Sequence, residues 1–477
     1  MKSLNRNTLQ KPALPVKILQ FGEGNFLRAF ADWMIDILNE RAGYQSGVAV
    51  VQPIPQGMVA RLEEQDGLYH HLLRGLSDGK IVDETRLITC ISQCIDPFKE
   101  PAQYFAQAVN RDLKIVISNT TEAGIRFDER DRPSPGDLAA TFPGKLSQLL
   151  KVRFDHFQGT PESGLVFIPC ELIDRNGDKL KEAILNYSEI WNYPKEFVYW
   201  LENYNFFGNT LVDRIVPGFP SDEIDTLRQN LGYRDNLMVS SESFHLWVIE
   251  GPGEIARAFP ADKVGLNVKF VPDMEPYRTR KVKILNGAHT AMVPIALLAG
   301  IETVKDAVED EVIGQFIREM LFEEIMPTID MPESELRTFA ENIMERFQNP
   351  FIRHALESIS LNAISKFKVR VLPSLTGYFK IKHQLPKGLV LALASLIKLY
   401  LSPDFEAKDD RKNLEFFSEA SEQSTSNDDL IQALMGNIYF WEMDLNTIPG
   451  LTSEVLSVFN ALEIGSPRNL LARQKYE

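Results

Sequence analysis

Apolar and polar residues alternate along the first half of the chain in a pattern that predicts strands and helices in turn. Four short runs rich in β-branched residues predict strands at residues 16–21, 48–51, 115–118 and 165–168. Amphipathic stretches, such as residues 26–39 and 146–157, lie between them and predict helices. This alternation is typical of a parallel sheet with helices on both faces, so we expect an α/β fold in this half.

The pattern changes near residue 276. Segments 281–298, 312–325, 333–347, 352–364 and 389–401 predict helices, with no comparable strands between them. Residues 402–429 are acidic and polar and predict a solvated loop. A chain of 477 residues is too long for one hydrophobic core. We therefore expect two domains, an α/β domain with a parallel sheet at residues 1–270 and a mainly α-helical C-terminal domain at residues 271–477.

The charge balance excludes several classes of partner. The chain has 51 basic and 66 acidic residues, a net charge of −15. This balance argues against binding to nucleic acid or to an anionic membrane, because both need a basic surface. The longest apolar run is also too short to cross a bilayer.

The cysteines and histidines predict no metal site. Cys90, Cys94 and Cys170 are an odd number in a long chain, which suits reduced thiols in a cytoplasmic protein. The seven histidines do not show the spacing of a zinc site. The first residues lack the apolar segment of a secretory signal, which also favours the cytoplasm.

A glycine pair follows the first predicted strand. Gly22 and Gly24 form a GxG turn, in which glycines allow the backbone to approach a pyrophosphate at the start of the next helix. Asn25, Phe26 and Arg28 open that helix, and Arg28 is a candidate cation for the phosphates. The turn predicts that the α/β domain is a Rossmann-type dinucleotide-binding domain, although Leu27 stands where a third glycine is usual.

The second strand lacks the usual ribose-binding acid. No Asp or Glu occurs between residues 41 and 62, and Gln52 at the end of this strand is the candidate for the ribose hydroxyls. The residues alone leave the choice between NAD and NADP open.

Polar residues gather at the start of the helical domain. On an ideal helix with Lys281 at 0°, Arg278 falls at about 60°, His289 at about 80° and Asn286 at about 140°. Reduction of a carbonyl needs a proton donor and hydrogen-bond donors for the developing alkoxide. Lys281 fits the first task, since neighbouring arginines would lower its pKa, and Asn286 with His289 fits the second. A partly buried helix with a few satisfied polar residues is the alternative interpretation.

Ordered motifs then resemble a known family. They are GxGxFxRA from Gly22, QDGLY from Gln65, TEAG from Thr121, PCE from Pro169, VDRI from Val212, KxxxxNGxH from Lys281 and RFxNP from Arg346. Together they resemble the mannitol dehydrogenase family of metal-independent polyol dehydrogenases. The resemblance implies NAD as cofactor and Lys281 as general acid/base, with Asn286 and His289 as ligands of the reacting oxygen. It also implies that Thr121 and Glu122 belong to the cofactor site and that Asp213 lies near the substrate.

Two departures from the family pattern concern the substrate. Leu172 stands where polyol dehydrogenases carry an asparagine of the oxyanion site, and Arg278 stands where mannitol-type members carry a glutamate. A cation at residue 278 would pair with the carboxylate of a sugar acid, which a neutral polyol lacks. An arginine exposed at a helix start is the alternative, and Lys366 and Arg370 are further candidates for the carboxylate.

The resemblance implies reduction of D-tagaturonate to D-altronate, and the reverse oxidation, in hexuronate catabolism. The alternatives are a fructuronate reductase or mannitol-type dehydrogenase on the same scaffold, and a non-catalytic nucleotide-binding protein. We expect a small sugar acid as the partner, neither nucleic acid nor membrane, and a monomer or small homo-oligomer.

Overall fold

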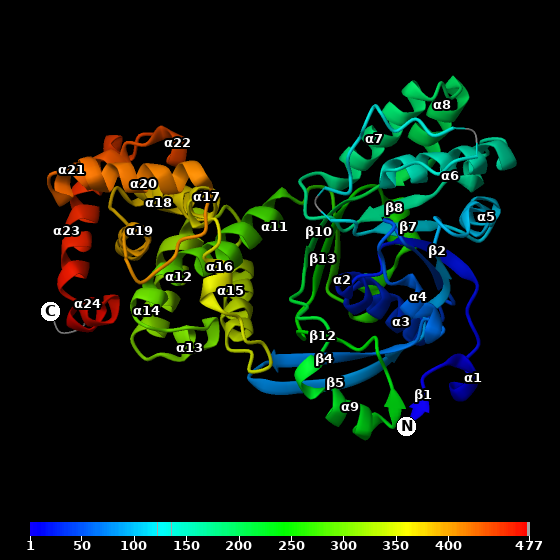
Figure 1. Ribbon diagram of the computed structural model, residues 1–477, viewed down its shortest axis with the longest axis horizontal. Coiled ribbons are helices and arrows are strands. Elements are labelled where there is room, and N and C mark those ends of the chain that lie inside the picture. Colours follow the sequence, from blue (N-terminus) through cyan, green and yellow to red (C-terminus); the bar gives the residue numbers. More distant parts are fainter. Residues whose placement is uncertain (122, 135, 475–477) are drawn as a thin grey trace. The chain divides into compact units, whose positions relative to one another are not determined.

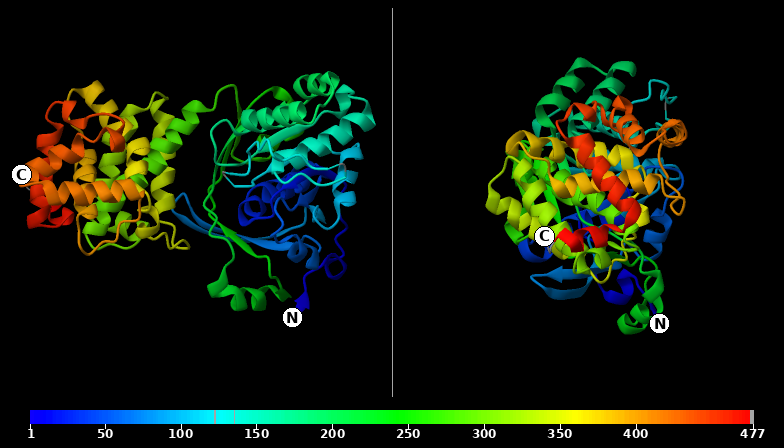
Figure 2. Two further views of the ribbon diagram at one scale, coloured as in Figure 1. Left: turned by 45° about the horizontal axis from the view of Figure 1, so that its top comes forward. Right: turned by 90° about the vertical axis from the view of Figure 1, so that its left-hand side faces the viewer.

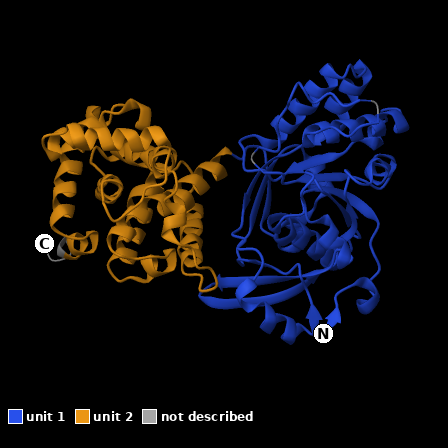
Figure 3. Ribbon diagram, viewed as in Figure 1, with its two compact units in different colours: residues 1–274 blue, residues 275–477 orange. Residues whose placement is uncertain are grey.

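The computed structural model describes residues 1–121, 123–134 and 136–474. They divide into two compact units, Met1–Met274 and Glu275–Glu477 (Figure 3). The first unit contains both strands and helices, and the part of the second unit that the structure describes is helical (Figure 1). The predicted order of an α/β domain followed by a mainly helical domain is confirmed.

The core of the first unit is a parallel sheet of six strands. These are β2 (Val16–Phe21), β3 (Gly47–Val51), β6 (Ile91–Ile95), β7 (Ile115–Ser118), β8 (Val166–Pro169) and β9 (Phe206–Phe207). Their order in the sheet is β6-β3-β2-β7-β8-β9, and every neighbouring pair is parallel. The four strands expected from the sequence are β2, β3, β7 and β8. The strand order reverses at β2, since the chain continues from β2 to β3 on one side and later returns to β7 on the other. The ends of β2 and β7 therefore lie side by side at the point where α/β sheets bind their ligands.

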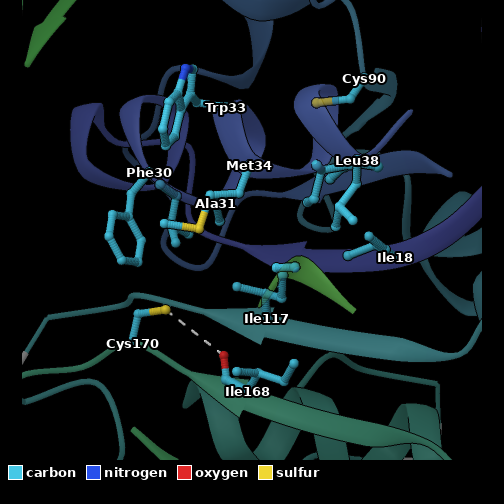
Figure 4. Packing of buried hydrophobic residues seen from close by; sticks show 14 of the residues in the cluster. Ile18, Phe30, Ala31, Trp33, Met34, Leu38, Cys90, Ile117, Ile168 and Cys170 are labelled. Carbon is cyan, nitrogen blue, oxygen red and sulfur yellow. Dashed lines mark hydrogen bonds between the residues drawn. The ribbon is translucent and has the colours of Figure 1, made fainter. Parts of the chain in front are cut away.

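The two faces of this sheet are covered by different helices. Alternate residues of β2 point to opposite faces, so Ile18 belongs to one buried cluster and Leu19 to the other. On the first face, Met34 and Leu38 of α3 (Ala31–Ala42) lie over Ile18 and the neighbouring strands (Figure 4). The second face packs against α6 (Phe142–Phe157), α7 (Asn176–Ile190) and α8 (Lys195–Tyr204). Apolar burial on both faces explains why these strands read as continuous apolar runs.

The first unit also contains three small sheets that the sequence pattern did not predict. Strands β12 (Val239–Ser241), β4 (Tyr69–Ser77) and β5 (Lys80–Ile88) form one, in which β4 and β5 make a long hairpin (Figure 2). Strands β10 (Asn209–Asp213), β13 (Leu246–Glu250) and β14 (Val268–Val271) form the second, and β1 (Lys2–Ser3) pairs with β11 (Tyr233–Arg234) in the third. The remaining helices of this unit are α1 (Arg6–Leu9), α2 (Asn25–Ala29), α4 (Val59–Glu64), α5 (Pro101–Ala106), α9 (Ile224–Leu231) and α10 (Gly253–Ala258).

The second unit is built around two buried helices. These are α12 (Ala288–Leu298) and α19 (Lys387–Tyr400), which pack against each other, and α19 also packs on α23 (Leu451–Ile464). The other elements are α11 (Glu275–Arg280), η5 (Lys281–Gly287), α13 (Val304–Glu309), α14 (Ile313–Glu319), η6 (Met320–Ile325), α15 (Glu333–Phe347), α16 (Leu356–Ile359), α17 (Ala363–Arg370), α18 (Leu372–Lys382), α20 (Arg411–Gln423), α21 (Asn427–Met435), α22 (Ile438–Trp441) and α24 (Pro467–Gln474).

Two expectations for this unit were wrong. The segment 402–429 is not a loop, because it contains all of α20 and the start of α21. Asp410 caps α20, whose buried residues Asn413, Phe417 and Ala420 follow helical spacing within a polar sequence. The helix expected over residues 352–364 is also not continuous, since only the short α16 and the start of α17 lie there, separated by Asn362 in a left-handed conformation with φ 54°.

A buried polar group lies beneath the first turn of the parallel sheet. Tyr69 donates its hydroxyl to Asp32 Oδ2 at 3.2 Å, and Gln20 Nε2 donates to the carbonyl oxygen of Gly22 at 3.1 Å and to Asp32 Oδ2 at 3.5 Å. Burial raises the pKa of the Asp32 carboxyl to about 7, although these donors and Arg28 oppose the change. Asp32 therefore takes up a proton on folding at mildly acidic pH.

The Asp32→Asn substitution tests this assignment through the pH dependence of stability. Because the pKa of Asp32 is higher in the folded protein, its contribution is present in full below the unfolded value of 3.8 and is lost as the pH rises through about 7. Between about pH 5.5 and about pH 8, wild type should lose roughly 2 kcal/mol more unfolding free energy than the variant. Urea denaturation at both pH values measures this, and parallel losses would contradict it.

Candidate active site

The turn after β2 depends on the absence of a side chain. Gly22 has φ +114°, and a Cβ there would lie 2.7 Å from the backbone oxygen of Asn119, which follows β7. Gly24 differs, because it is exposed and a Cβ there would meet nothing within 4 Å. The first glycine thus permits close packing of two loops, while the second leaves the backbone open to a ligand.

Arg28 supports this turn from inside the protein. Its guanidinium is buried and donates to the carbonyl oxygen of Glu23 at 3.2 Å and to Asn25 Oδ1 at 2.6 Å. It also stacks over the ring of Tyr69, 5.1 Å from its centroid. The side chains of Arg28 and Asn25 thus hydrogen-bond within the loop and stabilise its shape. The sequence, by contrast, suggested that Arg28 is a cation that faces the phosphates.

Glu171 is a buried carboxylate that the sequence analysis did not select. It follows β8 and accepts hydrogen bonds from the Ser118 hydroxyl at 3.0 Å, the Thr120 N–H at 3.0 Å and the Thr120 hydroxyl at 2.9 Å. Burial raises its pKa, although these donors oppose the change. Glu171 therefore joins the ends of β7 and β8, and its position directly after a predicted strand was the available signal.

Two cavities lie at this end of the sheet. One of about 570 Å³ is lined by Phe26, Asn119, Thr121, Ala123, Leu172 and Val212. Another of about 450 Å³ is lined by Glu23, Gly24, Gln56, Gly57 and Met58. Gly24 of the glycine turn lines the cavity of about 450 Å³, and Phe26 in the first turn of α2 lines the cavity of about 570 Å³.

The remaining predicted residues of the first unit lie around these cavities or outside the described part. Gln52 is buried and donates to the carbonyl oxygen of Pro55 at 3.1 Å, which shapes the loop that carries Gly57. Asp213 is buried at the end of β10, next to the cavity residue Val212. Glu122 lies outside the residues that the structure describes.

The segment that carries Lys281 is not a regular α-helix, which corrects the expectation for residues 281–298. Residues 281–287 form the π-helix η5 between α11 and α12. Its i→i+5 bonding gives a wider turn. The angle around the helix axis between Lys281 and Asn286, five residues apart, is therefore smaller than the ~140° of an ideal α-helix, and the two residues lie closer to one face. Lys283 points away from this face, since its ammonium donates to the carbonyl oxygen of Thr328 at 2.9 Å.

His289 is buried one turn further along, in α12. Its ring stacks on Phe347 with centroids 4.3 Å apart and meets the edge of the His354 ring at 5.1 Å. Burial lowers its pKa well below the usual value, and His354, Arg346 and Arg370 lower it further, so the ring is neutral near pH 7. Its buried Nε2 has no hydrogen-bond partner among the described residues.

The other predicted residues of the second unit differ in the hydrogen bonds and ion pairs that their side chains make. Lys281 and Asn286 are half-buried, and the Asn286 amide makes no hydrogen bond with any described residue. Arg278 pairs with Glu275 at 3.6 Å, and Lys366 donates to the carbonyl oxygen of Ile359 at 2.9 Å. Arg370 is half-buried at the end of α17.

Neither a membrane-spanning helix nor a metal-binding cluster occurs among the described residues. None of the described helices is both long and apolar enough to cross a membrane. Within residues 1–121, 123–134 and 136–474, no three His, Cys, Asp or Glu side chains are grouped so that they could hold a metal ion.

The parallel sheet with a glycine turn and the helical unit that follows it match two family models, and with the similar altronate oxidoreductases they identify an oxidoreductase that acts on CH–OH groups. The chain belongs to the mannitol dehydrogenase family. The family model described as "Mannitol dehydrogenase Rossmann domain" matches residues 16–318, and the model described as "Mannitol dehydrogenase C-terminal domain" matches residues 273–463. The family expected from the motifs is confirmed.

Curated relatives and solved structures agree with this assignment. The chain is 48% identical to an altronate oxidoreductase of Bacillus subtilis over 98% of both chains, and 44% identical to one of Bacteroides thetaiotaomicron over 97% of this chain and 98% of that one. A D-sorbitol dehydrogenase structure aligns over 98% of this chain and 99% of its own, with a TM-score of 0.80 at 20% identity. The mannitol 2-dehydrogenase of Pseudomonas fluorescens, in complex with NAD and D-mannitol, covers 100% of both chains with a TM-score of 0.68 and 20% identity. The two structures show that the fold is shared.

Replacement of Gly22 by alanine should lower the unfolding free energy more than replacement of Gly24. Gly22→Ala strains a positive φ and collides with the Asn119 carbonyl, so we expect a loss of about 1–3 kcal/mol in unfolding free energy. Gly24→Ala should change stability by less than about 0.5 kcal/mol, because the site is open. Urea denaturation of both variants measures the difference. Equal losses would show that the close approach at Gly22 is unimportant.

Proposed function

We propose that the protein catalyses the NADH-dependent reduction of D-tagaturonate to D-altronate, and the reverse oxidation, in hexuronate catabolism. Relatives at 43–48% identity over nearly the whole chain carry the name altronate oxidoreductase. In this proposal Lys281 is the general acid/base, and Asn286 and His289 bind the reacting oxygen.

The observation that carries the proposal is the buried Nε2 of His289, which has no partner among the described residues. Buried polar atoms in folded proteins are almost always hydrogen-bonded, so this atom points to a ligand oxygen. Asn286, three residues earlier, offers an amide that no described residue binds. A neutral imidazole and an amide are suited to hold a carbonyl or hydroxyl oxygen without changing its charge.

The first unit has the features that a dinucleotide needs. Gly24 leaves the backbone open at the start of α2 and lines the cavity of about 450 Å³, while Phe26 of α2 lines the cavity of about 570 Å³. Four residues would contact the cofactor: Gly22, Gly24, Phe26 and Thr121. Three others would shape the surrounding loops: Asn25, Arg28 and Gln52. The bound cofactor supplies or accepts the hydride.

The second unit supplies the proton chemistry. Hydride addition to a ketone leaves negative charge on the oxygen, which the Asn286 amide and the His289 ring would stabilise. The Lys281 ammonium donates its proton to that oxygen and takes it back in the oxidation. The wider turn of the π-helix supports this assignment, because it would bring Lys281 and Asn286 toward one face, from which both could reach the same substrate oxygen.

The cavity beside the glycine turn favours NAD over NADP. Its lining, Glu23, Gly24, Gln56, Gly57 and Met58, contains a carboxyl group and no cation. The 2′-phosphate of NADP is usually recognised by an arginine, and a nearby carboxylate would repel it. Gln52, which the sequence suggested for the ribose, instead supports the loop around Gly57.

Leu172 lines this site at the position where the polyol dehydrogenases carry an asparagine. Its side chain is 63% exposed and lines the cavity of about 570 Å³ with Phe26 and Val212. A leucine cannot bind an oxyanion, so Asn286 and His289 would do so without a second amide. A cytoplasmic location and a monomer or small homo-oligomer stay predictions from the sequence.

Replacement of Lys281 tests the mechanism, with Lys283 as the matched control. Lys281→Ala should reduce the turnover number for NADH oxidation with tagaturonate by at least about 100-fold, because general acid catalysis is lost. NADH binding, followed by fluorescence, should be unchanged. Lys283→Ala, on the same segment but bonded to Thr328, should keep near-normal turnover. Near-normal turnover of Lys281→Ala would refute the assignment.

A substrate panel tests the specificity. Tagaturonate, fructuronate, fructose and tagatose are compared with NADH and with NADPH by absorbance. Tagaturonate with NADH should give the highest kcat/KM. A preference for fructuronate or fructose would identify a sister specificity, and cofactor binding without turnover of any substrate would indicate a non-catalytic nucleotide-binding protein.

A further inference from the structure

A cluster of polar side chains around His289 includes two that the reaction chemistry does not use. His354 meets the His289 ring edge-on at 5.1 Å, and Arg370 lies close enough to lower the pKa of His289. Neither the His354 ring nor the Arg370 guanidinium makes a hydrogen bond or ion pair with any residue that the structure describes. Both are half-buried, where polar groups normally find partners.

The position of Arg370 follows from a close backbone contact. A Cβ on Gly287 would lie 3.0 Å from the backbone oxygen of Arg370, so any other residue would push the end of α17 away from η5 by a few tenths of an ångström. Burial lowers the pKa of the Arg370 guanidinium, and no carboxylate among the described residues contributes to that change. A half-buried cation without a counter-ion, in a chain of net charge −15, points to an anionic ligand.

The other cations suggested by the sequence are already engaged. Arg278 pairs with Glu275 at 3.6 Å within the same helix. Lys366 donates to the carbonyl oxygen of Ile359 at 2.9 Å. Among these candidates, Arg370 has the guanidinium fork that suits a carboxylate and no competing partner.

We propose that Arg370, together with His354, forms the subsite that binds the carboxylate of the sugar-acid substrate. This inference rests on the proposed function of the same site. In a hexuronate ketose the keto carbon and the carboxyl carbon are four bonds apart, roughly 5 Å when extended. The His289 and His354 rings are separated by 5.1 Å, so an oxygen at His289 leaves the carboxylate within reach of His354.

Paired substrates that differ only in charge test the proposal. D-tagatose matches D-tagaturonate except that a CH₂OH group replaces the carboxylate. Arg370→Gln should lower kcat/KM for tagaturonate at least tenfold, because a charge-assisted hydrogen bond is lost, and change that for tagatose less than about threefold. His354→Gln should show the same selectivity with a smaller loss. Arg370→Lys should recover part of the activity with tagaturonate, since it keeps the charge.

Arg278→Gln is the matched control and should affect neither substrate by more than about threefold. Equal losses on tagaturonate and tagatose in Arg370→Gln would show that Arg370 is only structural and would overturn the proposal. Selective loss in Arg278→Gln instead would move the subsite to Arg278. Weaker NADH binding by Arg370→Gln would mean that a cofactor phosphate, the other available anion, is its ligand, and would also overturn the proposal.

Failure of the proposed function gives a different result. If wild type does not reduce tagaturonate but reduces fructuronate, the same variants are compared on fructuronate and fructose. If no ketose is reduced, calorimetric titration of the NAD-loaded protein with D-altronate still measures binding of the anion. Binding that is tight in wild type and lost in Arg370→Gln supports the subsite without turnover, and binding unchanged by the substitution contradicts it.

Discussion

The carbonyl oxygen of Asn119 occupies the space in which any residue other than glycine at position 22 would carry its Cβ. This contact lets the loops after β2 and β7 lie against each other at the edge of the parallel sheet. Arg28 and Gln20 hold one loop through its backbone carbonyls, and Glu171 holds the other through Thr120. The surface around Gly24, the proposed dinucleotide site, is thus shaped by buried polar contacts behind it, which leave the backbone of Gly24 open.

Local pattern predicted the elements that bury apolar residues on regular faces. The strands β2 and β7 and the helix α15 have the expected bounds, because their periodicity is set by burial within each element. The helix α20 was missed because its apolar stripe is short and its surroundings are polar. The π-helix η5, which packs against the end of α17, was also missed, since its composition is that of an ordinary helix.

The candidate site was predictable in its residue types and less so in their partners. Lys281, Asn286 and His289 were chosen from spacing and family resemblance, without knowledge of which polar atoms lack partners. Sequence alone could not distinguish Arg278 from Arg370 as an anion ligand, because the difference lies in the ion pair of Arg278 with Glu275. Nor could it select Glu171, whose hydrogen-bond partners come from a separate strand end.

The contact between Gly287 and the end of α17 involves the main chain of residue 370 and not its side chain. Every amino acid presents the same carbonyl oxygen, so residue 370 can change its identity while the packing against η5 stays the same. If Arg370 binds the substrate carboxylate and Lys281 transfers the proton, as proposed, substrate preference and proton transfer are encoded in separable parts of this unit. Under that proposal, a single substitution at the end of α17 would change the preference between acidic and neutral sugars without altering the segment that carries Lys281.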